Sequence, residues 1–287
     1  MTVRSESTAP TSELARRIDE AASYVRGRTS LKPEVGLILG TGLGDFASSL
    51  ATEAVVPYRE IPHFPVSTVE SHAGELHLGR LAGRPAAIMK GRVHYYEGYS
   101  MRDVTFPVRV LKALGCRTLV ITNACGAMNP DMPPGSLVVN TDHINLMGDN
   151  PLIGPNDESL GPRFPDMSEP YTRKLVTLAE RVALDLKIPL QRAVFVAVPG
   201  PNLETAAEYR FLRWIGADVV GMSLVPETIV AVHGGQRVLA LSVVTDACLP
   251  DNLHPVELAQ VLAVAGRAAP ALVRLVTEIV RRLDEAG

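Results

Sequence analysis

Short apolar runs alternate along this chain with longer stretches of helical periodicity, and this alternation restricts it to few folds. The runs are rich in Val, Ile and Leu and predict strands over Val35–Leu39, Ala86–Met89, Thr118–Thr122, Ser136–Val139, Ala193–Val198, Asp218–Gly221 and Val238–Val244. The stretches between them predict helices over Glu13–Arg26, Met101–Leu114, Ser168–Leu186, Leu203–Ile215, Pro226–His233 and Pro255–Asp284. Apolar strands between helices are typical of a sheet covered on both faces. We therefore expect an α/β fold with a mixed, mostly parallel central sheet flanked by helices.

The chain length and the absence of repeats or linkers in the sequence predict one domain. The 287 residues are 46% hydrophobic, enough for one large core, and we assign residues 13–287 to it. Residues 1–12 are rich in Ser and Thr and are expected to be disordered. Pro270 is expected to kink or divide the last helix. The stretch Thr141–Asp166 is expected to be a long loop that covers a site or reaches a neighbouring subunit.

Composition argues against several classes of function. A net charge of -3 provides no basic surface for a nucleic-acid backbone. The cysteines Cys116, Cys125 and Cys248 match neither a disulfide framework nor a metal-ligand spacing, which favours a reducing cytoplasm. The first 12 residues lack the apolar core of a signal peptide, and no apolar run approaches the ~20 residues that span a bilayer. We expect a cytoplasmic protein that binds neither nucleic acid nor membrane.

The segment Gly91–Tyr99 places an arginine, a histidine and three tyrosines directly after an apolar run. Arg92 and His94 are two residues apart, so on an extended segment both side chains project from one face and can converge on one phosphate. The alternative for this segment is an ordinary solvated loop.

Two clusters of small residues also follow predicted strands. Gly40–Gly44 can bring backbone N–H groups and the Thr41 hydroxyl to an anion, although its spacing fits neither a dinucleotide fingerprint nor a P-loop. In Thr122–Pro130, Ala124 and Gly126 can donate N–H groups to a ligand, and Cys125 is expected to pack rather than react. A tight turn or a bend that needs small residues explains either cluster alone.

Two acidic residues follow later strands. Glu204 is expected at the start of a helix after Val198–Gly200, where an acid is commonly only a partner of the helix dipole. Asp246 ends the strand at Val243–Ala247, and Val220–Ser223 ends another in small residues. If these strands are parallel, Glu204 and Asp246 lie at one rim of the sheet.

The ordered combination of motifs closely resembles the trimeric class of the purine nucleoside phosphorylase and methylthioadenosine phosphorylase family. The similarity extends from about Val35 to the C-terminus and rests on Gly40–Gly44, His72–Gly74, Gly91–Tyr99, Thr122–Gly126, Asp142–Leu146, Gly154–Asp157, Arg163–Pro165, Gly200–Thr205 and Gly221–Ser223. The resemblance implies phosphate-dependent cleavage of purine (2'-deoxy)ribonucleosides to free base and (2-deoxy)ribose 1-phosphate, in purine salvage. It also implies a homotrimer in which inorganic phosphate is a co-substrate and neither metal nor organic cofactor takes part.

The resemblance further implies a role for individual residues of this chain. Phosphate is expected against Thr41, Arg92, His94, the Ala124 N–H and Ser223, with His72 in a supporting place near the phosphate entrance. The nucleoside is expected against Tyr96, Leu203, Glu204, Val220, Met222, Thr245, Asp246 and Leu258, with Phe164 contributed by the neighbouring subunit. Asp246, His94 and Glu204 are the expected catalytic residues.

Two positions depart from the vertebrate-like form of the family. Asp246 stands where that form has an asparagine that serves 6-oxopurines. An ionised aspartate accepts hydrogen bonds only and favours a 6-amino group, but two carboxyl groups in one pocket favour a proton on one of them, so both base classes stay open. Leu258 aligns with a histidine that contacts the sugar 5'-hydroxyl, and an apolar residue there favours a 5'-methylthio group, unless His254 supplies the contact. A 6-aminopurine-directed enzyme such as a methylthioadenosine phosphorylase is therefore the alternative.

Overall fold

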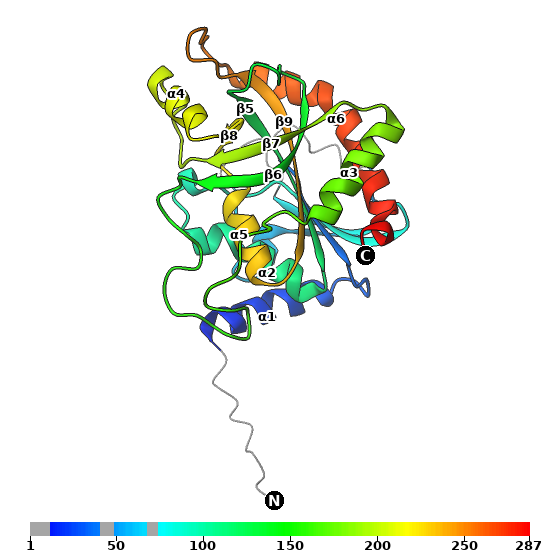
Figure 1. Ribbon diagram of the computed structural model, residues 1–287. Coiled ribbons are helices and arrows are strands. Elements are labelled where there is room, and N and C mark those ends of the chain that lie inside the picture. The colour runs from blue at the N-terminus through cyan, green and yellow to red at the C-terminus, as the bar shows by residue number, and fades with distance from the viewer. Residues whose placement is uncertain (1–11, 41–48, 68–73) are drawn as a thin grey trace, which may run out of the picture.

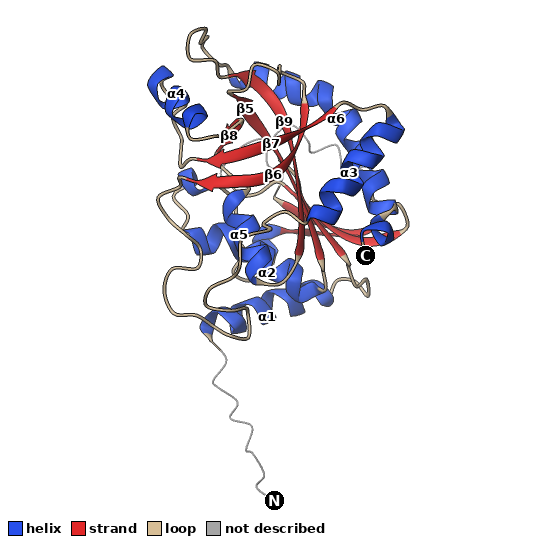
Figure 2. Cartoon of the chain, in the orientation of Figure 1, coloured by secondary structure: helices blue, strands red, loops and turns tan. Residues whose placement is uncertain are grey.

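The computed structural model describes residues 12–40, 49–67 and 74–287. Within them, one mixed sheet forms the centre of the molecule and helices surround it (Figures 1 and 2). The strands are β1 (Val35–Ile38), β2 (Ala51–Pro57), β3 (Glu75–Leu81), β4 (Arg84–Lys90), β5 (Thr118–Ala127), β6 (Leu137–Asn145), β7 (Leu190–Ala197), β8 (Val219–Gly221) and β9 (Arg237–Ala247). The helices are α1 (Glu13–Arg26), α2 (Met101–Leu114), α3 (Arg173–Leu186), α4 (Ala206–Trp214), α5 (Val225–His233) and α6 (Leu258–Arg281). The expected α/β class and mixed central sheet are confirmed.

Part of the sheet closes on itself. Its order is β2-β3-β4-β1-β5-β8-β7-β6-β9, and β5 pairs with β9 as well as with β8. The strands β5, β8, β7, β6 and β9 therefore form a ring. Pairs β5–β9, β6–β7 and β7–β8 are parallel, whereas β5–β8 and β6–β9 are antiparallel. Thus β7, which precedes Glu204, and β9, which contains Asp246, run in opposite senses. The condition on which we expected Glu204 and Asp246 at one rim, that these strands are parallel, is therefore wrong.

The local signals predict some element boundaries closely and others poorly. The predicted bounds of α1 and α2 are confirmed, and Ser12 and Ser100 accept hydrogen bonds from the backbone N–H groups of Ala15 and Asp103 at their N-termini. Ser12 is thus part of the fold, whereas residues 1–11 lie outside the described residues. The strands β2 and β3 were not predicted from continuous apolar runs, because β2 is a largely exposed edge strand and β3 alternates buried and less buried positions.

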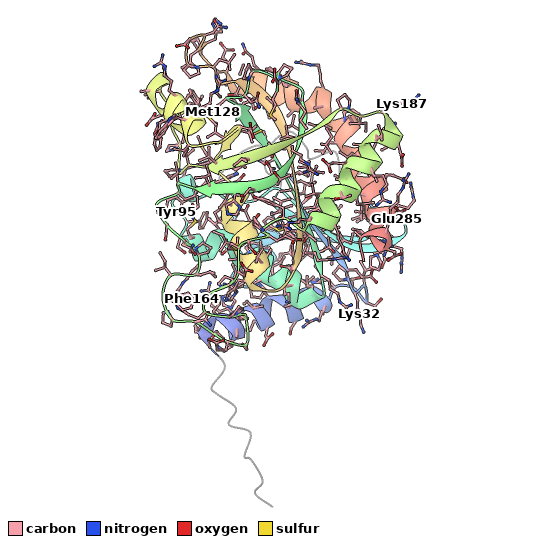
Figure 3. All side chains as sticks on the ribbon, in the orientation of Figure 1. Lys32, Tyr95, Met128, Phe164, Lys187 and Glu285 are labelled. Atoms are coloured by element: carbon pink, nitrogen blue, oxygen red, sulfur yellow. The ribbon has the colours of Figure 1, made fainter. Side chains whose placement is uncertain are left out.

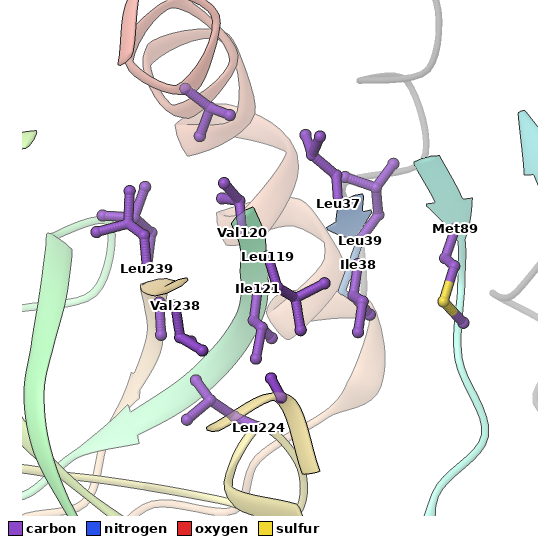
Figure 4. Packing of buried hydrophobic residues seen from close by; sticks show 14 of the residues in the cluster. Leu37, Ile38, Leu39, Met89, Leu119, Val120, Ile121, Leu224, Val238 and Leu239 are labelled. Atoms are coloured by element: carbon purple, nitrogen blue, oxygen red, sulfur yellow. The ribbon is translucent and has the colours of Figure 1, made fainter. Parts of the chain in front are cut away.

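The helices form two groups on the sheet. Contacts join α1 to α2 and α2 to α5 on one side, while α3 packs against α6 on the other, as Figure 1 shows. Figure 4 shows the apolar interior between these layers, in which Leu37, Val120 and Leu239 come from neighbouring strands and Leu224 comes from the start of α5. This core holds the carboxyl ends of β5 and β9 at fixed positions.

We expected Pro270 to kink or divide the last helix; α6 continues through Pro270, so the helix is not divided there. Among the residues that the structure describes, α6 is also the helix long and apolar enough to cross a membrane by length and composition, which differs from our expectation. Its buried residues, including Leu272, Val276 and Ile279, pack against α3 and β9. The apolar stretch of α6 is 28% buried, and the buried residues, which lie between Ala265 and Val280, join this part of the helix to the core.

The long loop begins later than expected, because Thr141–Asn145 belongs to β6. Residues 146–172 then contain neither helix nor strand, and α3 begins at Arg173, after the predicted start at Ser168. The Glu169 carboxylate accepts a hydrogen bond from the Arg173 N–H at 2.9 Å, so the residues before α3 cap the helix rather than extend it. Figure 3 labels Phe164 on this loop, at the edge of the molecule in that view.

Candidate active site

One cavity of about 200 Å³ collects most of the residues that the sequence analysis selected. It lies where β4, β5, β8 and β9 end and where the segment before α4 crosses them. The expected residues that line it are Arg92, His94, Tyr96, Ala124, Leu203, Glu204, Val220, Met222, Ser223, Thr245 and Asp246. These residues come from five separate stretches of sequence, which therefore meet in one place.

The arginine of the cavity is held by a buried acid. Arg92 Nη1 donates to Glu227 Oε1 at 2.9 Å, and Arg92 Nη2 donates to the Thr122 carbonyl oxygen. Both charged side chains are 3% exposed. A buried arginine with a carboxylate on one side is fixed in orientation, and its planar donors can serve an anion on the other side.

His94 is fixed by the turn that follows β4. Its backbone N–H donates to Glu97 Oε1 at 2.7 Å, and its Nδ1 lies 3.2 Å from the same oxygen. The imidazole also stacks on Tyr96, with ring centroids 4.8 Å apart and planes 10° apart. A carboxylate at Nδ1 favours a proton there and leaves Nε2 as the second functional nitrogen.

Ser223 lies where β8 passes into α5. Leu224, the next residue, has φ of +75°, which is a rare conformation for a residue other than glycine. The strained backbone turns the chain so that Ser223 lines the cavity directly before the N-terminus of α5. The N-terminal N–H groups of a helix favour an anion nearby.

The acid Glu204 stands in the segment before α4 and not at the start of the helix. Thr205 is the N-cap of α4 and shares a capping box with Glu208, so the helix begins at Ala206, after the predicted Leu203. Burial raises the pKa of Glu204, a hydrogen bond from Tyr209 lowers it, and the negative charge of Asp246 raises it. The net direction is upward, which favours a proton on Glu204 at a higher pH than on an exposed glutamate.

Asp246 lies within β9 and not after its end. Its register partner across the β5–β9 pair is Gly126, beside a shift of register at Cys125. A Cβ atom at Gly126 would lie 2.9 Å from Asp246 Oδ2 and would overlap Cys248 Sγ. The predicted small residues of Thr122–Gly126 thus belong to β5, where they allow the Asp246 side chain to approach the neighbouring strand.

Three expected site residues are not placed in this cavity, and two lie outside the described residues. Leu258 is 66% exposed, and the cavity wall in this region is made by Val256 and Val261. Phe164 is 86% exposed, beneath the guanidinium of Arg163, and lies at a separate surface hollow with His143 and Ile229. His254 is exposed. Thr41 and His72 fall in the stretches that the structure does not describe.

Sequence reasoning missed several residues that line or support the cavity. Asn123, Tyr209, Cys248, Val256 and Val261 line it, and Glu227 supports Arg92 from α5. The position of Glu227 offered a signal, because an acid in the apolar run Val225–Val232 is buried and needs a partner. In the described part of the chain, no group of three His, Cys, Asp or Glu side chains has the arrangement of a metal site.

Comparisons with known proteins agree with this geometry. The family model described as "Phosphorylase superfamily" matches residues 34–281. Purine nucleoside phosphorylase 1 of Bacillus subtilis is 49% identical over 268 residues, which are 93% of this chain and 99% of that protein.

Solved structures are similar over the same extent. Isoform 2 of purine nucleoside phosphorylase from Schistosoma mansoni, in complex with cytosine and ribose-1-phosphate, superposes with a TM-score of 0.90 at 39% identity and covers 93% of this chain and 96% of that one. Purine nucleoside phosphorylase from the same organism in complex with inosine has a TM-score of 0.89 at 38% identity, with 93% and 96% covered.

Proposed function

The chain belongs to the purine nucleoside phosphorylase family, and from its cavity we propose that it cleaves purine (2'-deoxy)ribonucleosides with inorganic phosphate. The products are the free purine base and (2-deoxy)ribose 1-phosphate. The observation that supports this most directly is that an anion-binding group and two carboxyl groups line one cavity. The first consists of Arg92, His94 and Ser223, and the second of Glu204 and Asp246.

The phosphate end of the cavity combines several donors. Arg92, His94, Ser223 and Ala124 all line it, and α5 begins beside Ser223. Such donors bind a dianion most strongly where water is excluded. The proposal adds Thr41 and, near the entrance, His72 to this group.

The reaction exchanges one bond at the anomeric carbon. The C1'–N9 bond breaks and its electron pair moves to the purine, while the sugar develops oxocarbenium-like positive charge. A phosphate oxygen held beneath the sugar forms the new C1'–O bond. One carboxyl group of the Glu204 and Asp246 pair gives a proton to the leaving base. Hydrogenphosphate loses one proton when it becomes the sugar phosphate. Water carries that proton to the carboxylate, so the carboxyl group is restored and no net proton is consumed.

The sugar and the base fit the rest of the wall. In the proposal, Tyr96 and Met222 lie against the sugar, and Leu203, Val220 and Thr245 lie beside the base. Phosphate is the one co-reactant that this bond exchange requires, so the proposal includes neither a metal nor an organic cofactor. It places the enzyme in purine salvage in the cytoplasm.

The proposal includes a homotrimer. Phe164 is an exposed aromatic residue on a loop that lies away from the cavity of its own chain. A large exposed apolar side chain of this kind is typical of a subunit interface. We propose that Phe164 reaches the sugar site of the neighbouring subunit.

The test measures base release by chromatography from inosine, guanosine and adenosine, each with and without phosphate. Phosphate-dependent release of at least one base is expected, and no release from any of them contradicts the proposal. Ser223→Ala removes one donor to phosphate and is expected to raise the KM for phosphate about tenfold or more, since a hydrogen bond to a charged group contributes about 1.5–3 kcal/mol. Ser23→Ala, at an exposed position of α1, is the matched control and leaves this KM unchanged.

A second candidate is a phosphorylase for 5'-methylthioadenosine, favoured by the apolar side chains of Val256 and Val261 in the cavity wall. An apolar wall offers no hydrogen-bond partner to a 5'-hydroxyl group, so it does not favour a substrate that carries one. Comparing inosine with 5'-deoxyinosine separates the two candidates: a large loss of kcat/KM without the hydroxyl contradicts the apolar 5' site.

A further inference from the structure

A buried histidine at the end of α5 lies against the long loop. His233 is the last residue of α5 and is 3% exposed. Its Nε2 lies 3.4 Å from Asn156 Oδ1 on the loop, and its Nδ1 lies 3.4 Å from Nη1 of Arg109 on α2. A Cβ atom at Gly161 would overlap the His233 carbonyl oxygen and lie 2.7 Å from Cε1 of the ring. The loop segment 156–161 therefore packs directly on this histidine.

The neighbours of the imidazole determine where its proton is. A guanidinium group only donates hydrogen bonds, so His233 Nδ1 accepts from Arg109 and the proton lies on Nε2. Asn156 Nδ2 donates to Glu158 Oε1 at 2.8 Å and to the Gly161 carbonyl oxygen at 3.1 Å. The amide oxygen of Asn156 is therefore the atom that accepts from His233 Nε2. Donors and acceptors match at every contact of the ring.

This arrangement needs a neutral imidazole. Burial and the positive charge of Arg109 lower the pKa of His233, with a further contribution from Lys112, and these effects exceed the opposing effect of Glu158. The ring is therefore neutral at pH 7, with one acceptor for α2 and one donor for the loop.

The segment that packs on His233 is joined to Phe164. Arg163 Nη1 donates to the Gly154 carbonyl oxygen at 2.7 Å, and its guanidinium carbon lies 5.6 Å from the centroid of the Phe164 ring. Another contact of the loop with α2, from Arg102 to the Ile153 carbonyl oxygen, is exposed, and an exposed hydrogen bond competes with water. The buried contact with His233 therefore contributes most to the position of the segment before Phe164.

We propose that His233 is a positioning residue for nucleoside binding. It holds segment 156–161 against α2 and α5, and so determines where Phe164 reaches into the sugar site of the neighbouring subunit. His233 is not among the described residues that line the cavity of its own chain, so it acts through the loop and not on substrate. This inference rests on the proposed function, because it requires the sugar site that two subunits share.

The two ends of α5 make this role distinguishable from a general effect on the helix. The first turn of α5 holds Glu227, the partner of Arg92, and directly follows Ser223 in the phosphate site. A disturbance of the whole helix would therefore change the KM for phosphate. A displaced loop would change the KM for the nucleoside alone.

The first experiment measures both KM values, with whichever of inosine, guanosine and adenosine the parent cleaves fastest. We expect His233→Ala to raise the KM for the nucleoside about threefold to tenfold and to leave the KM for phosphate unchanged, since small misplacements of a substrate-positioning group are costly. His233→Gln keeps a donor near the place of Nε2 and should restore most of the loss. His63→Ala removes a histidine that pairs with Glu20 at 2.6 Å, outside the loop and the cavity, and should change neither KM. An unchanged nucleoside KM in His233→Ala, or an equal rise in both KM values, overturns the inference.

The second experiment is a double-mutant cycle with Phe164→Ala. If His233 acts through Phe164, the double variant has the same kcat/KM as Phe164→Ala alone. Losses that add contradict the inference and leave the proposed function intact. If Phe164→Ala itself leaves kcat/KM unchanged, the shared sugar site of the proposed function is contradicted, and the inference falls with it.

Gly161→Ala tests the same contact from the side of the loop. Its Cβ would displace the segment from His233, so we expect the same rise in the nucleoside KM with an unchanged phosphate KM. This variant decides the question if thermal unfolding shows that His233→Ala does not fold. Parental values of both KM in a folded Gly161→Ala overturn the inference.

Discussion

Arg92 and Glu227 form an ion pair of 2.9 Å between the end of β4 and the first turn of α5, and each side chain is 3% exposed. The second carboxylate oxygen of Glu227, Oε2, has no hydrogen-bond partner among the residues that the structure describes. The pair therefore holds one cation at the cavity and leaves its acid incompletely hydrogen-bonded. We therefore expect the stability of the fold to depend on whether the proposed phosphate site is occupied.

Glu227→Gln tests this link. The variant leaves Arg92 buried without a counter-charge, and breaking a buried pair typically costs about 3–5 kcal/mol. We expect a loss of that order in the free energy of unfolding without phosphate, and recovery of part of it in excess phosphate, which supplies the missing charge. Urea unfolding with and without phosphate measures both quantities.

The control for this prediction is Glu180→Gln. Glu180 pairs with Arg192 at 2.6 Å on the surface, where removal of the charge costs about 0–1 kcal/mol and phosphate has no specific effect. A phosphate effect of equal size in both variants shows that the anion does not act at Arg92.

The raised pKa of Glu204 predicts a pH-dependent stability. Burial raises the pKa of this group in the folded chain above its unfolded value, so the folded state keeps a proton that the unfolded state has lost. The resulting stabilisation is complete below the unfolded pKa and is lost as the pH rises through the folded pKa.

Glu204→Gln removes this titration. Relative to the parent, its free energy of unfolding should therefore be higher at pH 8 than at pH 5. Denaturant unfolding at the two pH values measures the difference. Glu208→Gln is a poor control, because Glu208 caps α4, so we choose Glu53→Gln on the exposed strand β2. If the free energy of unfolding of Glu204→Gln, relative to the parent, is instead higher at pH 5 than at pH 8, the predicted upward shift of the Glu204 pKa is contradicted.

Gly126→Ala should damage the base end of the cavity. The added Cβ would overlap Cys248 Sγ and lie 2.9 Å from Asp246 Oδ2, so both side chains must move. Overpacking of this kind costs about 1–3 kcal/mol of stability. We also expect kcat/KM to fall, since Asp246 is displaced. Thermal unfolding and steady-state kinetics measure the two effects.

Gly266→Ala is the matched substitution in α6. A Cβ there meets no atom within 4 Å, so the variant should be more stable than the parent by about 0.5–1 kcal/mol through helix propensity. Unchanged activity in Gly126→Ala would show that the close approach of β5 to Asp246 is dispensable.

Phe164→Ala should impair the nucleoside site without weakening the subunit's own core. Because Phe164 is 86% exposed, truncation removes little packing from its own chain. In the proposed trimer it removes an aromatic contact with the sugar. We therefore expect kcat/KM for the nucleoside to fall about tenfold or more. A tenfold change corresponds to about 1.4 kcal/mol, which is within the range that single interface residues contribute.

Leu184→Ala provides the comparison for Phe164. Leu184 is 77% exposed on α3, away from the long loop, and its truncation should leave the kinetics unchanged. Size-exclusion chromatography determines whether both variants keep the parent's assembly. A monomeric parent with full activity would contradict the shared site.

Prediction from sequence succeeded for elements that neighbouring residues specify and failed for elements that depend on pairing with distant segments. Helices α1 and α2 have serine N-caps and clear apolar periodicity, and their bounds were predicted without error. The exposed edge strand β2 has no continuous apolar run, and its pairing with β3 is what makes it a strand. The lengths of β5, β6 and β9 were underestimated, because their polar ends gain hydrogen-bond partners only from neighbouring strands.

The same distinction applies to the site. Arg92, His94 and the resemblance in separated motifs were visible in the sequence, since residue type and spacing carry them. Glu227 was missed because Arg92 is 135 residues away and only the folded geometry brings the two side chains together. Cys248 was missed although Asp246 is only 2 residues away, because the sequence does not show that its thiol turns toward Asp246 Oδ2. Leu258 was selected by alignment, yet Val256 and Val261 are the residues that turn toward the cavity.

The amino-acid sequence by itself determined the α/β class and the helices with strong caps, and it predicted the residue types of the proposed phosphate and base sites, because these depend on local periodicity and residue identity. The resemblance to a known family already placed Glu204 and Asp246 in one pocket, but only the tertiary structure decided how they come to share it. The strands that lead to them run in opposite senses, and the closed ring of β5, β8, β7, β6 and β9 brings them together. Pairing between distant strands depends on the whole core, and no local stretch of sequence contains that information.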